Sequence, residues 1–217
     1  MIIRESPVSV PAGFGEPVFE EQGGRRVLWT IQGTGEADVL VCDMSHRPKA
    51  LLLDVEGDAP APGGARWDGG AWTGTLGPGE SCYYDLLGDL DQARLPEGAV
   101  DMTDAWALLV VFGPRAPELM HRLTALDTDP ALRKEPLFLA TRSHNAGVRI
   151  LNTKGPMGFL VACDRGYGQD LYAACLHVPA PPVVKPAGVL DYTKWLESAG
   201  GETGPKTGGR EVSHGNS

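Results

Sequence analysis

The sequence lacks the long features that mark several protein classes. No apolar run approaches the roughly 20 residues that a membrane-spanning helix needs, and no apolar stretch follows a basic start, as it would in a signal peptide. No basic run interrupts a formal net charge of −9, so most of the surface should repel nucleic acid and anionic membranes. The sequence therefore predicts a cytoplasmic protein that binds neither nucleic acid nor membrane.

Cysteine pairs and catalytic motifs are equally scarce. Cys42, Cys82, Cys163 and Cys175 form no CxxC pair, and three of them lie in apolar patterns that predict buried, reduced thiols. The chain has no GxSxG, no GxGxxG between a strand and a helix, and no GxxxxGK[ST]. Its closest Cys–His spacings lie in apolar elements, whereas zinc motifs use paired ligands in loops. We therefore expect no catalytic residue, no cofactor and no metal in this chain.

Short apolar runs, separated by glycine and proline, are what the chain does have. We expect strands near residues 27–31, 36–44, 49–57, 71–75, 80–87, 106–112, 137–142, 147–152 and 158–163. Helices are expected at residues 115–126, where Leu119, Met120, Leu123 and Leu126 form one stripe, and at 166–176. Residues 1–26, rich in Gly, Pro and Glu, predict an irregular arm.

This order of elements predicts an α+β fold, with helices on one face of largely antiparallel sheets. Three segments are expected along the chain. Residues 1–98 form a strand-rich N-terminal half and residues 99–178 an α+β half. Residues 179–217 form a proline-rich arm with a short closing helix and a disordered tail, because proline removes backbone donors and the tail is of low complexity.

The sequence Asp-Met-Ser/Thr occurs twice, at residues 43–45 and 101–103, each time before an apolar strand. Asp and Ser/Thr side chains hydrogen-bond nearby backbone donors and so close turns. On that interpretation the repeat belongs to the fold. The alternative is a catalytic signature, in which Asp43 or Asp101 is a general base or anchors a cation.

Directly after the first copy, polar and charged residues are concentrated in one short stretch. Asp43, Ser45, His46, Arg47 and Lys49 fall within seven residues, and the last three form a local positive cluster. Such a cluster suits a small carboxylate or a folate-like anion. Asp43, Ser45, His46 and Arg47 are therefore candidate ligand-binding residues, and the alternative is an exposed turn with a solvated histidine.

Residues 67–176 resemble the gamma subunit of heterotetrameric sarcosine oxidase and, more distantly, the glycine cleavage T protein and related folate-dependent aminomethyltransferases. The resemblance rests on LGPGE at residues 76–80, on VDMTDAWALLVVFGPRAPELMHRLTALDTDP at 100–130, and on YGQDLYAAC at 167–175. CDMSHRPKALLLDVEG at 42–57 is similar to a first copy of the same signature, with Pro48-Lys49 where the family has Pro-Arg.

The resemblance implies an aminomethyltransferase-like fold and a function in one-carbon metabolism. In that family the complex demethylates sarcosine on a flavin and passes the one-carbon unit to tetrahydrofolate. FAD, FMN, NAD and tetrahydrofolate would then belong to larger flavoprotein subunits, and this chain would be a helper without turnover of its own. The alternatives are a stand-alone folate-dependent aminomethyl transferase recruited to another pathway, and a scaffold that associates with itself.

Overall fold

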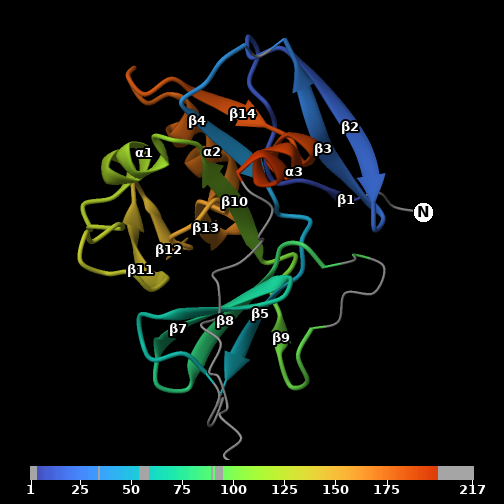
Figure 1. Ribbon diagram of the computed structural model, residues 1–217. Helices are drawn as coiled ribbons and strands as arrows, with labels where there is room; N and C mark the ends of the chain where they lie inside the picture. The colour runs from blue at the N-terminus through green and yellow to red at the C-terminus, as the bar shows by residue number, and fades with distance from the viewer. Residues whose placement is uncertain (1–3, 34, 54–58, 89, 91–94, 200–217) are drawn as a thin grey trace, which may run out of the picture.

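The computed structural model describes residues 4–33, 35–53, 59–88, 90 and 95–199, which form three β-sheets and three α-helices (Figure 1). Sheet A has the order β1-β3-β2, from β1 (Arg4–Glu5), β3 (Arg25–Gln32) and β2 (Glu16–Gln22). Sheet B has the order β11-β12-β13-β10-β4-β14, from β11 (Leu137–Ser143), β12 (Ala146–Asn152), β13 (Phe159–Asp164), β10 (Trp106–Phe112), β4 (Val39–Asp43) and β14 (Val184–Ala187). Sheet C has the order β6-β7-β8-β5-β9, from β6 (Ala65–Asp68), β7 (Ala71–Gly77), β8 (Glu80–Asp85), β5 (Lys49–Leu53) and β9 (Val100–Asp101).

Sheet B carries an apolar core on each face. Helices α1 (Ala116–Leu123) and α2 (Gly168–Leu176), the second preceded by a 3₁₀ turn at Arg165–Tyr167, pack on one face. Sheet C and helix α3 (Val189–Ser198) pack on the other. Strand β10 lies between β13 and β4, and all seven of its residues are buried. This arrangement confirms the α+β fold with largely antiparallel sheets; β1 with β3 and β14 with β4 are the parallel pairs.

Two glycines show how closely the layers approach. A Cβ atom added at Gly74 of β7 would lie 2.4 Å from the ring of Phe138 on β11, so this glycine lets the sheets meet there. A Cβ at Gly188, just before α3, would lie 2.2 Å from the backbone of Trp29 on β3. Side chains larger than hydrogen would therefore push sheet C and α3 away from the strands they cover.

The N-terminal prediction was wrong. Residues 1–26 were expected to be irregular, but the described part contains β1 and β2, and β2 forms an antiparallel hairpin with β3. Strand β2 escapes sequence patterning because EPVFEEQ is polar and mostly exposed, so it is held by pairing with β3 rather than by burial. Helix α1 also ends earlier than expected: Thr124 has extended backbone, and Leu126 is 46% exposed.

The proline-rich stretch contributes an edge strand. Val184–Ala187 forms β14, which pairs in parallel with β4, and α3 follows at once. Proline is tolerated at such an edge because one side of the strand needs no backbone donor. The tail predicted to be disordered, residues 201–217, lies outside the described residues. The division at residues 98 and 178 stays a prediction, and sheet B combines strands from all three segments.

The repeated Asp-Met-Ser/Thr turns form one reciprocal joint between sheets B and C. Ser45 and Thr103 each donate a backbone N–H to the carboxylate two residues earlier, at 3.0 and 2.8 Å. The Ser45 hydroxyl then accepts the Leu108 N–H at 3.0 Å, and the Thr103 hydroxyl accepts the Lys49 N–H at 3.1 Å. Each turn thus holds the strand that follows the other turn. The geometry supports the structural interpretation of the repeat.

Candidate functional site

The loop after β4 is buried, contrary to the alternative of an exposed turn. Lys49 is fully buried, and His46 and Arg47 are 8% and 7% exposed. Burial comes from segments far along the chain: residues 4–7, 85–88 and 100–106. The sequence marked these residues as unusual, but it could not show that distant segments cover them.

Arg47 and Lys49 have structural partners within this loop and its surroundings. Arg47 donates to the Asp85 carboxylate at 2.9 Å, to the Asp85 carbonyl at 3.2 Å and to the Gly88 carbonyl at 2.6 Å. Lys49 Nζ donates to the carbonyls of Ser45 and Arg47, both at 2.8 Å. These contacts shape the loop and join it to sheet C, so neither cation points toward a ligand.

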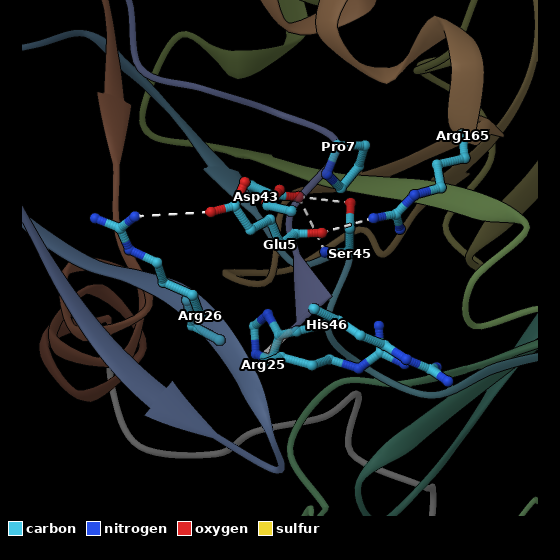
Figure 2. Close-up of a pocket in the computed structure, with 11 residues that line it drawn as sticks. Glu5, Pro7, Arg25, Arg26, Asp43, Ser45, His46 and Arg165 are labelled. Carbon is cyan, nitrogen blue, oxygen red and sulfur yellow. Dashed lines mark hydrogen bonds and ion pairs between the residues drawn. The ribbon is translucent and has the colours of Figure 1, made fainter. Parts of the chain in front are cut away.

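Asp43, Ser45 and His46 instead face a small pocket beneath the N-terminal segment (Figure 2). The Ser6 hydroxyl hydrogen-bonds to Asp43 from above, and Arg165 donates to the Glu5 carbonyl at 2.6 Å. Sequence analysis missed this cover because residues 1–26 carried no periodic signal. The remaining residues around the pocket are Arg4, Pro7, Arg25, Arg26 and Val27.

The pocket is small and electrostatically mixed. Its volume is about 10 Å³, close to what one water molecule requires. Arg4 and Arg25 both pair with Asp104. His46 is different, because its Nε2 atom is buried and has no hydrogen-bond partner among the described residues. In its present shape this pocket accommodates a solvent molecule rather than a folate-sized ligand.

Burial sets the protonation of the loop. Burial first, and then the positive charges of Arg47, Lys49 and Arg25, together lower the pKa of His46 to about 3. Burial also lowers the pKa of Lys49 to about 7, although the Asp43 carboxylate opposes that change. The pKa of Asp43 is raised by burial, against hydrogen bonds from Ser45 and Ser6. His46 is therefore neutral at pH 7.

Acid should destabilise the protein through His46. The unfolded chain takes up a proton at the ordinary pKa of 6.5, whereas the folded chain takes it up only near 3. Because the folded-state pKa is the lower one, this stability is complete above about pH 6.5 and is lost as the pH falls. At about 1.4 kcal/mol per pH unit, the loss should be about 2–3 kcal/mol between about pH 6.5 and 4.5.

Denaturant unfolding across this pH range measures the effect. The variant His46→Leu, which cannot be protonated, should have a flatter profile by that amount. His121→Leu is the matched control, since the His121 side chain is 55% exposed and already meets water in the folded chain. Parallel profiles for wild type and His46→Leu would contradict the assignment.

The thiols confirm the prediction of buried, reduced cysteines. All four are free and buried. Burial raises the pKa of Cys82 to about 11 and those of Cys163 and Cys175 to about 12, which keeps these thiols protonated and poorly nucleophilic. In the described part of the chain, no three His, Cys, Asp or Glu side chains gather as metal ligands would. None of the described helices combines the length and apolarity that crossing a bilayer requires.

The arrangement of sheets and helices is an aminomethyltransferase-like α+β fold, which confirms the fold that the sequence resemblance implied. No family model and no curated protein sequence matches the chain. Solved structures do match it in shape, and two of them are described next; their sequence identities are low enough that the likeness shows the fold alone.

One is a chain of the heterotetrameric sarcosine oxidase from Corynebacterium sp. U-96, solved in complex with pyrrole 2-carboxylate. Its TM-score is 0.53 at 17% identity, over 67% of this chain and 88% of that chain. The other is the glycine cleavage system aminomethyltransferase T from Bartonella henselae, with a TM-score of 0.58 at 15% identity. That match covers 82% of this chain but 57% of the aminomethyltransferase, so this chain spans just over half its length.

Proposed function

We propose that this chain is a non-catalytic helper subunit of a heteromeric, flavin- and folate-linked complex that demethylates amines, as sarcosine oxidase does. The observation that carries the proposal is how much of each solved chain this chain matches. The fold matches 88% of a chain from a heterotetrameric oxidase, but 57% of the aminomethyltransferase. A chain that matches most of one subunit and only part of a separate enzyme fits the role of a subunit better.

The loop supports the same proposal. Arg47 and Lys49 hold the backbone, and Ser45 closes the joint between sheets. These three side chains of the loop are thus already engaged in folding contacts. In the proposed complex, FAD, FMN, NAD and tetrahydrofolate belong to the larger flavoprotein partners, and the assembly is cytoplasmic.

Isolation of the tagged chain from its native host tests the proposal. We expect a partner that carries flavin absorbance and oxidises sarcosine or dimethylglycine to co-purify with it, while the chain alone forms no methylenetetrahydrofolate from these amines and tetrahydrofolate. Product formation by the isolated chain would overturn the subunit proposal. Sedimentation of the purified chain separates self-association from a requirement for a different partner.

A stand-alone transferase is the second candidate, and His46 is the observation that favours it. Its Nε2 atom is buried without a partner, and His46 lines the pocket together with Arg25, Arg165 and residues 4–7. In such an enzyme, His46→Leu would weaken binding of tetrahydrofolate or the amine without unfolding the chain. Arg47 is a poor probe of this idea, because its loss would disturb the fold first.

A further inference from the structure

A second, larger cavity lies between sheet B and the β7–β8 hairpin. Its volume is about 330 Å³, within the range of small-ligand pockets. Leu76 and Glu80 of the hairpin form one wall. The floor is sheet B, where the remaining lining residues are Ala140, Thr141, Gly147, Val148, Arg149 and Asp164.

Strand register explains why this part of sheet B is hollow. Side chains alternate between the two faces of a strand, so Gly147 and Arg149 of β12 share a face with Leu151, which is part of the core beneath sheet C. Ala140 and Ala162 are the cross-strand neighbours of Arg149. Because these neighbours are small, Arg149 is the long side chain among them, and the surface of the sheet around it is hollow.

Arg149 is a cation held in place without a carboxylate. Its guanidinium lies 4.3 Å from the centre of the Trp106 ring. Its Nε atom is buried and has no hydrogen-bond partner, and none of the described acidic residues forms an ion pair with it. A buried donor without an acceptor costs roughly 1–3 kcal/mol, which an incoming acceptor would recover.

Tyr84 is not part of this site. Its hydroxyl is buried without a hydrogen-bond partner on the inner face of sheet C, but Tyr84 does not line the cavity. Arg149 is the arginine that lines it, and a guanidinium forms strong hydrogen bonds with a carboxylate.

The opening of the cavity limits the charge of its ligand. Glu80 and Asp164 are both exposed and both line it. Two negative charges beside one positive charge disfavour a phosphate or a dicarboxylate, whereas Leu76 and Ala140 offer contact to an apolar group. We propose that this cavity binds a small organic monocarboxylate, with its carboxylate at Arg149 and its apolar part against the β7–β8 hairpin. This inference does not depend on the helper-subunit proposal.

Calorimetric titration of the full chain with benzoate and butyrate tests the site, with succinate and inorganic phosphate as competing probes. We expect saturable binding of the monocarboxylates and at least tenfold weaker binding of both dianions. Arg149→Met should lower monocarboxylate affinity at least tenfold. Lys134→Met, which removes one positive charge from an exposed loop, is the control and should bind as wild type does.

Gly147→Leu tests the cavity with Arg149 intact. A Cβ atom at Gly147 would meet nothing within 4 Å, so the added side chain can enter the cavity without displacing the fold. It should also weaken binding at least tenfold, and it reports on the site even if Arg149→Met fails to fold. Absence of saturable binding by the wild type, equal affinity for phosphate, or unchanged affinity in Gly147→Leu would each overturn the proposal.

Discussion

Replacement of Arg47 by methionine should lower the free energy of unfolding by about 3–5 kcal/mol, the range measured when one partner of a buried ion pair is removed. Arg47 and Asp85 are 8% and 7% exposed and lie 2.9 Å apart. Without the guanidinium, the Asp85 carboxylate would stay buried, and among the described residues it would keep the Gly88 N–H at 2.8 Å as a donor. The Gly88 carbonyl would lose its contact as well. Denaturant unfolding at pH 7 measures the loss.

Two further variants separate charge burial from other effects. Arg47→Met combined with Asp85→Leu should recover a substantial part of the loss, because a buried pair exchanged for apolar groups is often neutral. Arg115→Met removes an arginine from a solvent-exposed pair with Glu118 and should change stability little. If Arg47→Met unfolds no more easily than Arg115→Met, Arg47 does not anchor the loop.

Truncation of Leu123 to alanine should cost about 2–5 kcal/mol, from lost transfer energy and from the cavity left behind. Leu123 is 4% exposed and packs in the core between α1 and sheet B, as its position in the apolar stripe predicted. Leu132→Ala makes the same chemical change at a residue that is 98% exposed, and it should stay within about 0.5 kcal/mol of wild type. Thermal and denaturant unfolding of both variants provide the comparison.

Thr103→Ala completes this comparison. It removes the acceptor of the buried Lys49 N–H, which should cost about 1–2 kcal/mol. Activity of the assembled complex, measured per folded molecule, should be unchanged. Intact stability with lost activity would instead make the Asp-Met-Thr turn a functional site.

Sequence patterns predicted burial well where apolar residues fill whole elements. Strand β10 was placed at its observed bounds because Trp106–Phe112 is continuously apolar and rich in β-formers. Strand β2 was missed because its seven residues are held by backbone pairing with β3, which leaves no periodic trace. Strands whose side chains are buried, such as β10, can thus be predicted from the sequence, whereas an exposed edge strand such as β2 cannot.

The polar sites were also predictable from the sequence only in part. The sequence singled out the loop at residues 43–49 by its density of charge, but the partners that bury it, Ser6, Asp85 and Thr103, lie far along the chain. The pattern of GVRILN predicts a strand and does not by itself mark Arg149 as a site residue. A signal was present: an arginine two residues before Leu151 occupies a core-facing position, where a charge needs a reason.

The joint between the two Asp-Met-Ser/Thr turns has a consequence for how the chain closes on itself. Strands β4 and β10 are antiparallel neighbours in sheet B, and the chain between them forms the whole of sheet C. Sheet C is therefore an insertion between two adjacent strands of sheet B. Ser45 and Thr103 connect the two ends of this insertion. Bringing the two ends of so long an insertion together costs chain entropy. If the two turns pair before β10 joins β4, the pairing of these two strands no longer has to meet that cost. Because the paired turns fix both ends of the insertion, its size and surface could change in relatives while sheet B stays the same.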